Sequence, residues 1–149
     1  MNDNGNSQES LLALDRQVCF ALYSAQLAMS KVYRKLLKEL DLTYPQYLVM
    51  LVLWEEDGQT VSGIGERLFL DSATLTPLLK RLETAGLLRR QRSHEDERQV
   101  EVVLTEQGQA LRERAEAVPE SVMCATQCSP EELERLRDDL HKLRQRLTD

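Results

Sequence analysis

The chain has 149 residues, of which 42% are hydrophobic and 30% charged, and its net charge is −6. A chain of this length fits one domain with a sizeable core, and its composition is too apolar for a disordered protein. No apolar run approaches the roughly 18 residues of a membrane span, and the polar start lacks the basic and apolar regions of a secretory signal. We therefore expect a cytoplasmic protein without membrane contact.

The negative net charge argues against a nucleic-acid partner, because phosphate binding needs a basic surface. The charges are, however, unevenly distributed. Between Ser72 and Arg98 six basic residues stand against four acidic ones, which gives this segment a net charge of +2 and leaves −8 for the rest. One face can therefore meet DNA, whereas the alternative for such a charge run is an ordinary solvated surface.

The first predicted element is one long amphipathic helix. Residues 1–10 are polar and expected to fray, and over residues 11–40 apolar side chains recur every three or four positions. The segment 41–45 ends this helix, because a residue before proline is pushed out of the helical region. Pro45 suits the first turn of a second helix, which runs to about Glu56.

Two short helices with a tight turn follow. Ser62 is positioned to cap the first, which runs to about Leu68, and Asp71 or Ser72 to cap the second, which ends near Gly86. This arrangement is a helix-turn-helix. Leucines form the buried stripe of its second helix. The residues toward or beside solvent are Ser72, Thr74, Thr76, Pro77, Lys80 and Arg81.

A change to period-two alternation predicts a hairpin with strands at about 87–92 and 100–104 and a polar tip between them. The hairpin carries Arg90, Arg92 and Arg98. A guanidinium at the tip of such a wing can enter a narrow minor groove, and Asp96 is placed to brace Arg98. The second helix of a helix-turn-helix enters the major groove, so we predict that helix and hairpin together read DNA.

The last helix has the clearest start signal. Ser129 is a capping residue, Pro130 occupies the first helical position, and Glu132 lies three residues after the cap. Both this helix and the first bear an apolar stripe that has no evident partner within so small a chain. Pairing with a second copy would cover both stripes, and an isologous homodimer is the commonest solution.

The expected fold class is therefore mainly α (α+β), with the whole chain, 1–149, forming one domain. Dimerisation helices at about 11–41 and 105–148 surround a winged helix-turn-helix at about 46–104. Helical periodicity resumes at Thr105 and is disturbed by Pro119.

The segment DSATLTPLLKRLETAGLLRRQRSHEDERQVEVVLTEQG resembles the recognition helix and wing of the MarR family of transcription regulators, including a D-x-R followed by L-T-x-x-G. By organisation the resemblance extends over about residues 11–148. It implies a dimer that binds palindromic operators in double-stranded DNA. The alternative, a winged helix used only for protein contacts, is disfavoured because the outward residues are cationic and hydroxylated.

Cys19 lies beside the apolar stripe of the first helix, where a lone cysteine is more often a small buried hydrophobe. The organic-hydroperoxide regulators of the MarR family are similar to this chain in having a reactive cysteine here, a tyrosine fourteen positions later and another eleven beyond. Cys19, Tyr33 and Tyr44 match that spacing. The resemblance implies that tyrosine hydroxyls stabilise a thiolate, which a peroxide oxidises to sulfenic acid.

A helix advances about 1.5 Å per residue, so Tyr33 lies about 21 Å along the axis from its own Cys19. Only the Tyr33 of another subunit can then touch that thiol. The spacing therefore predicts that the thiol site is shared between two subunits.

Cys124 and Cys128 form a C-x-x-x-C pair, which can be half of a zinc site. His94 and His141 lack the spacing of further ligands, so we expect no metal and no cofactor. A resolving thiol, which condenses with the sulfenic acid to a disulfide, fits better. Cys128 adjoins a helix N-terminus, where anions are favoured, but Cys124 matches the resolving position of the two-cysteine members that the chain resembles, and we favour it.

These features predict a repressor that leaves its operator when organic hydroperoxides oxidise Cys19. A disulfide needs α-carbons within about 7 Å, so thiols that lie apart when reduced must move to form one. The first alternative is a repressor released by a small aromatic ligand in the crevice between the dimerisation helices and the winged module. The second is a thiol peroxidase. We expect no enzyme, because the chain lacks a redox C-x-x-C motif and a cation suitably spaced from Cys19.

Overall fold

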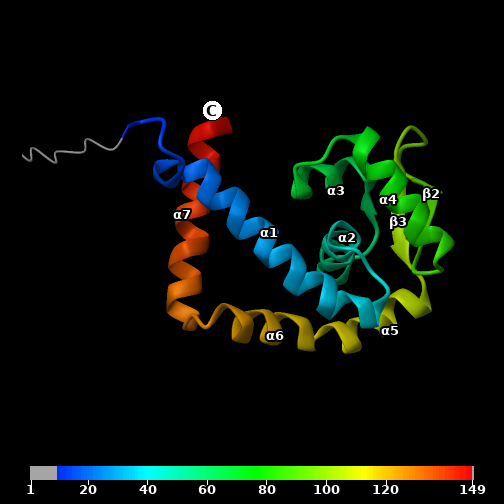
Figure 1. Cartoon of the computed structure of the whole chain (residues 1–149). Coiled ribbons are helices and arrows are strands. Elements are labelled where there is room, and N and C mark those ends of the chain that lie inside the picture. The colour runs from blue at the N-terminus through cyan, green and yellow to red at the C-terminus, as the bar shows by residue number, and fades with distance from the viewer. Residues whose placement is uncertain (1–9, 149) are drawn as a thin grey trace, which may run out of the picture.

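The computed structural model describes residues 10–148, and its elements are arranged as a helical part beside a small winged module (Figure 1). The helices are α1 Val18–Leu37, α2 Tyr44–Glu55, α3 Val61–Leu68, α4 Ser72–Thr84, α5 Glu106–Ala115, α6 Ala117–Thr126 and α7 Pro130–Thr148. The strands are β1 Gln59–Thr60, β2 Leu88–Arg92 and β3 Val100–Leu104. The predicted mainly helical fold with a small sheet is confirmed; the expected fraying concerns residues that, Ser10 apart, lie outside the described part.

The first helix begins later than the sequence predicts. α1 starts at Val18, and residues 14–16 form only a short 3-10 turn. The side-chain amide Nε2 of Gln17 donates to the carbonyls of Leu11 and Ala13 at 2.7 and 3.0 Å, and these bonds fold the preceding segment back. Apolar periodicity continued through this segment, but periodicity reports which face is apolar and not where a helix begins. As a result Cys19 lies in the first turn of α1.

Side-chain caps fix the starts of the next three helices. Thr43 forms a capping box with Gln46 at the start of α2. Thr60, not the predicted Ser62, caps α3, because its hydroxyl accepts the N–H of Gly63 at 3.0 Å. Asp71 caps α4 through the N–H of Thr74 at 2.8 Å, which decides between the two predicted caps.

The winged module contains a three-stranded antiparallel sheet of order β1-β3-β2. The predicted hairpin pairs β2 with β3, with Leu88 opposite Leu104, and the short β1 adds a strand that was not predicted. Asp57 accepts the N–H of Leu104 at 2.8 Å, and the indole of Trp54 donates to the carbonyl of Gly108 at 2.9 Å. The first bond attaches β3 to the turn after α2, and the second attaches α2 to α5.

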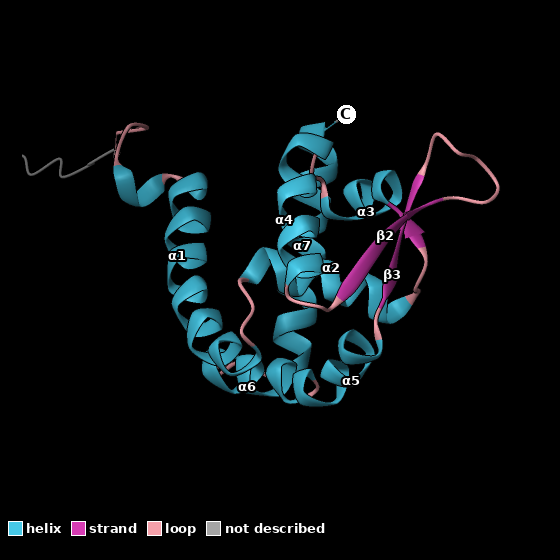
Figure 2. Ribbon diagram, turned by 90° about the vertical axis from the view of Figure 1, so that its right-hand side faces the viewer, coloured by secondary structure: helices cyan, strands magenta, loops and turns pink. Residues whose placement is uncertain are grey.

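The core lies in the winged module and the helices next to it. Its fully buried side chains are Leu37, Val49, Met50, Leu53, Ile64, Leu75, Leu79, Leu82, Leu88 and Val102. By contrast α7 has no buried residue, and in α1 only Leu37 is buried. Figure 2 shows that α1 and α7 stand apart from each other. Among the described residues, no helix is long and apolar enough to cross a membrane.

Candidate DNA-binding surface and thiol sites

The exposed face of α4 carries the residues that the sequence assigned to it. Ser72, Thr74, Pro77, Lys80 and Arg81 are exposed and Thr76 is half-buried. Three leucines of the predicted stripe are buried and hold the opposite face in the core, whereas Leu78 is only half-buried. Hydrogen bonds from the N–H and hydroxyl of Thr74 hold the pKa of Asp71 below its ordinary value, so this cap is anionic at neutral pH. α4 therefore offers hydroxyls and two cations on a helix with a fixed start.

Arg90 is placed differently from the other wing arginines. The carboxylate of Glu83 accepts the N–H of Arg90 at 2.9 Å and its guanidinium at 3.1 and 3.3 Å. These bonds lower the pKa of Glu83. Both side chains are about one-third exposed or less, at 26% for Arg90 and 35% for Glu83. The guanidinium of Arg90 is therefore directed back to α4, where it ties the wing to the helix.

The other two wing arginines that the sequence assigned to DNA binding face solvent. Arg92 is exposed, and the side chain of Arg98 is 94% exposed. Asp96 accepts the N–H of Arg98 at 3.0 Å and lies 3.6 Å from its Nε, as the predicted brace requires. The buried Ser93 hydroxyl accepts the N–H groups of Glu95 and Asp96 and shapes the tip.

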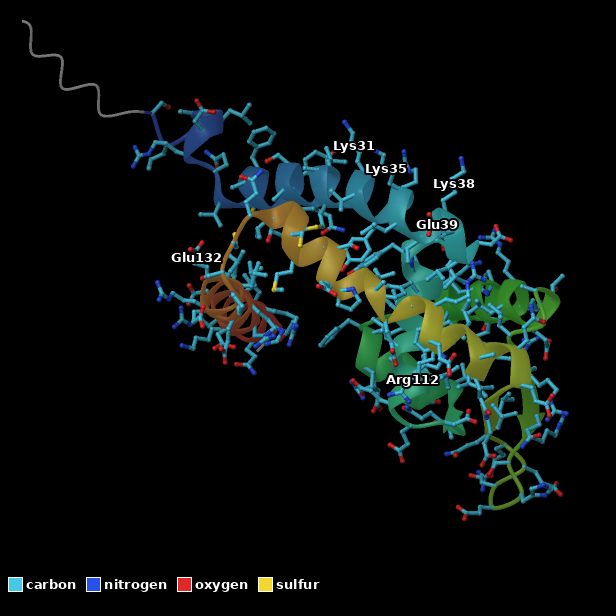
Figure 3. The ribbon with its side chains drawn as sticks, turned by 90° about the horizontal axis from the view of Figure 1, so that it is seen from below. Lys31, Lys35, Lys38, Glu39, Arg112 and Glu132 are labelled. Carbon is cyan, nitrogen blue, oxygen red and sulfur yellow. The ribbon has the colours of Figure 1, made fainter. Side chains whose placement is uncertain are left out.

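A second cationic group lies at the end of α1, outside the segment 72–98 whose net positive charge marks the DNA-binding surface. Lys31 and Lys35 of α1, and Lys38 directly after its last residue, are exposed and project to the same side (Figure 3). Their spacing of four and three residues could have revealed the group, because residues so spaced share a helix face.

The three cysteines are free in the described structure, with Cys19 and Cys124 exposed and Cys128 half-buried. Cys19 and Tyr33 belong to one uninterrupted helix, so the axial separation of about 21 Å inferred from the sequence applies within the chain. The fold thus does not bring the thiol to Tyr33 or Tyr44 of its own chain.

Tyr33 and Tyr44 do meet, with ring centroids 4.6 Å apart, and Tyr47 joins them at 5.9 and 6.3 Å. Tyr47 was not predicted as part of this group, although its position three residues after Tyr44 marks the same face of α2. Burial, together with the neighbouring Tyr44 and Tyr47, raises the pKa of Tyr33 to about 12. Burial also raises the pKa of Tyr44. Both phenols remain hydrogen-bond donors at neutral pH.

Cys124 and Cys128 flank the junction of α6 and α7. Cys124 lies in the last turn of α6, which ends where Gln127 adopts a left-handed conformation with φ 57. The thiol of Cys128 donates to the carbonyl of Thr126 at 3.4 Å, and the predicted cap Ser129 accepts the N–H of Glu132 at 3.1 Å. Over residues 10–148 no three potential metal ligands gather around this pair.

A partly apolar hollow of about 280 Å³ lies between α2 and the α5–α6 segment. Tyr47, Leu51 and Trp54 form its apolar wall. Its charged lining residues are Arg112 (Figure 3), Glu55 and Glu116. The alternative predicted from the sequence, an aromatic ligand near the junction of the helical part and the winged module, has a candidate cavity here.

Comparison with known proteins shows which family shares this sequence and architecture. A family model described as the transcriptional regulator SarA/Rot matches residues 31–114. The organic hydroperoxide resistance transcriptional regulator of Bacillus subtilis is 47% identical over 132 residues, which cover 89% of this chain and 90% of the relative. The chain is a winged-helix transcription regulator of the MarR type. The family predicted from the recognition helix and wing is thereby confirmed.

Two further comparisons agree with this assignment. The transcriptional regulator TtmR of Methylorubrum extorquens is 51% identical over 135 residues, covering 91% of this chain and 69% of the relative. Reduced AbfR bound to DNA, a Staphylococcus epidermidis protein, aligns with a TM-score of 0.75 and 39% identity over 91% of this chain and 95% of that chain. The disulfide form of AbfR aligns with a lower TM-score of 0.62, at 42% identity over 87% of this chain and 91% of that chain.

Proposed function

We propose that this MarR-type regulator represses transcription by binding a palindromic operator as a homodimer and leaves the DNA when an organic hydroperoxide oxidises Cys19. The relationship to the hydroperoxide regulator of Bacillus subtilis, joined to the placement of Cys19 and the tyrosine cluster, carries this proposal. We assign the activity to the cytoplasm, with no cofactor and no metal.

The operator contacts come from α4 and the wing. The exposed Ser72, Thr74, Lys80 and Arg81 would face the major groove, with Thr76 and Pro77 beside them. Arg98, braced by Asp96, would enter the minor groove beside the wing, and Arg92 would contact phosphate. Arg90 supports this surface indirectly, since Glu83 holds it against α4.

The redox step needs only the thiols and the peroxide. The Cys19 thiolate attacks a peroxide oxygen, the O–O bond breaks, and the sulfur becomes a sulfenic acid while the departing alkoxide takes a proton from solvent to give an alcohol. The Cys124 thiol then condenses with the sulfenic acid, so that an S–S bond forms and water leaves. Tyr33 and Tyr44 of the second subunit donate hydrogen bonds to the thiolate, which their raised pKa values permit.

A gel-shift titration on the promoter next to the gene, with and without cumene hydroperoxide, tests this function. The wild type should bind when reduced and leave when oxidised, whereas Cys19→Ser should bind in both conditions, since serine keeps the size and loses the nucleophile. Release of Cys19→Ser by peroxide would assign sensing to another group. Steady peroxide consumption with a thiol reductant would instead indicate a thiol peroxidase.

Non-reducing electrophoresis identifies the resolving thiol. After brief peroxide treatment, Cys128→Ser should give a covalent dimer band that dithiothreitol removes, and neither Cys19→Ser nor Cys124→Ser should give it. A band that persists in Cys124→Ser and vanishes in Cys128→Ser would transfer the resolving role to Cys128. A monomeric oxidised product that still leaves DNA would refute the intersubunit bridge.

The second candidate function is release by a small aromatic ligand, with the cysteines incidental. The hollow beside Trp54 favours it, because its apolar aromatic wall suits a small aromatic ligand and Arg112 offers a polar anchor beside the carboxylates of Glu55 and Glu116. Release of Cys19→Ser from the operator by such a compound, and loss of that release in Arg112→Gln, would support this candidate.

A further inference from the structure

The turn between α3 and α4 carries an aromatic side chain in an unusual setting. Phe69 ends α3 with φ 58, a left-handed conformation that bulky residues rarely adopt. Its side chain is 67% exposed, so core packing does not explain it. A backbone outlier of this kind next to a DNA-reading helix points to a functional constraint on the residue.

A cation from the far end of the chain covers this ring. The guanidinium carbon of Arg144, in the second half of α7, lies 4.4 Å from the centroid of Phe69, and the Arg144 residue is half-buried. This geometry is a cation–π contact. It connects the C-terminal helix with the turn of the helix-turn-helix, although α7 has no buried residue of its own.

Hydrogen bonds and close packing in the turn connect Phe69 to the start of the recognition helix α4. The N–H of Leu70 donates to the carbonyl of Gly65 at 3.0 Å, and the N–H of Phe69 donates to the same carbonyl. A Cβ on Gly65 would lie 2.7 Å from the carbonyl oxygen of Leu70, so the chain is closely packed there. Asp71, the cap of α4, follows directly. Phe69 also lines a hollow of about 480 Å³ between α3 and α4, so the ring is not enclosed on that side.

The N-terminal end of α7 lies directly after Cys124 and Cys128 in the chain. Arg144 lies fifteen residues after Ser129, about 22 Å along a continuous helix. The left-handed Gln127 separates α6 from α7, and Cys124 occupies the helical turn just before it. A disulfide formed at Cys124 would therefore act next to the start of α7, and a continuous helix would carry a displacement there on to Arg144.

We propose that Arg144 and Phe69 form the contact through which α7 holds the recognition helix in its DNA-binding position, and that disulfide formation at Cys124 withdraws Arg144 from the ring. This inference rests on the proposed redox control of DNA binding. Arg144 is a positioning residue, since its effect on α4 passes through Phe69.

Operator affinities of the reduced and the fully oxidised protein, the latter prepared with cumene hydroperoxide, test this coupling. Arg144→Gln should weaken the reduced form about two- to fivefold, the size of an exposed cation–π contact, and leave the oxidised form unchanged. The ratio of the two affinities then shrinks by the same factor. Arg144→Lys keeps a cation for the ring and should keep most of the ratio. Arg146→Gln, an exposed residue of α7 with the same charge change, should leave both affinities unchanged.

Phe69→Leu should reproduce the effect of Arg144→Gln, and the double variant should show no further loss, because the contact is already absent. If Arg144→Gln lowers both affinities equally, or neither, the coupling is overturned while wild-type release on oxidation still supports the proposed function. A wild type that stays on the operator when oxidised overturns the proposed function itself.

Discussion

Mixed dimers can decide whether the tyrosines act across a subunit interface. Within one chain Cys19 and Tyr33 are about 21 Å apart along α1, so a hydrogen bond to the thiolate has to come from the second copy. We predict that a dimer of one Cys19→Ser chain and one Tyr33→Phe chain is oxidised at the native rate per thiol. Its single Cys19 still faces an intact Tyr33.

The matched dimer pairs a wild-type chain with a Cys19→Ser/Tyr33→Phe chain. Its single Cys19 shares a chain with Tyr33 but faces the altered chain, in which the phenol hydroxyl at that position is missing, so its oxidation should be slow. A hydrogen bond to a charged group contributes about 1.5–3 kcal/mol, which corresponds to a rate about ten- to a hundredfold lower if the bond is made in the transition state.

Sulfenic acid formation can be followed by trapping with dimedone and mass spectrometry of purified, differently tagged dimers. Tyr47→Phe is the control for ring packing: this residue belongs to the same aromatic cluster but is only 3% exposed, and the variant should react at the native rate. Slow oxidation of the first mixed dimer together with native oxidation of the second would refute the intersubunit assignment.

The remaining predictions concern the DNA surface and the wing. Lys80→Ala and Arg98→Ala should each weaken operator binding in gel shifts while the dimer stays intact, and only the Arg98 effect should depend on operator A·T content; unchanged affinity in both contradicts the assigned surface. Glu83→Gln removes the carboxylate that holds the wing and should lower the free energy of unfolding in urea by about 1 kcal/mol. Because the pKa of Glu83 is lowered, this contribution is present above its ordinary pKa and disappears as the pH falls through the folded value, so variant and wild type should converge in acid. Gly108→Ala would put a Cβ 2.0 Å from the carbonyl oxygen of Leu87 and should lower the unfolding free energy by more than about 2 kcal/mol, measured in the same way.

Most element boundaries that a local signal marks were predictable, although the cap of α3 is Thr60 and not the predicted Ser62. Pro45 near the start of α2, the cap at Asp71 and the serine–proline pair at residues 129–130 each act within one turn of helix, and the structure uses all three. The start of α1 was wrong because its determinant, the amide of Gln17 reaching back to two carbonyls, leaves no mark in the apolar periodicity.

The candidate site was predictable in its residues but less so in its contacts. Residue type and spacing selected Arg90 together with Arg92 and Arg98. The ion pair of Arg90 with Glu83, however, joins strand β2 to the end of helix α4, and no local sequence pattern predicts it. The contact of Arg144 with Phe69 is likewise not predictable from the sequence, because it depends on the directions that α6 and α7 take in the fold.

Two features of the single chain indicate that it functions together with a second copy. Val18 and Tyr23 of α1 are 64% and 61% exposed, and Leu136 and Leu147 of α7 are 54% and 76% exposed, which leaves two apolar stripes in water. The thiol of Cys19 likewise lies far from Tyr33 and Tyr44 of its own chain. We infer that one second copy supplies both the apolar cover and the tyrosines. Under the proposed function, oxidation at Cys19 would then act on the surface that holds the dimer together. A change at one sulfur would thereby alter the spacing of two recognition helices that must meet successive major grooves about 34 Å apart.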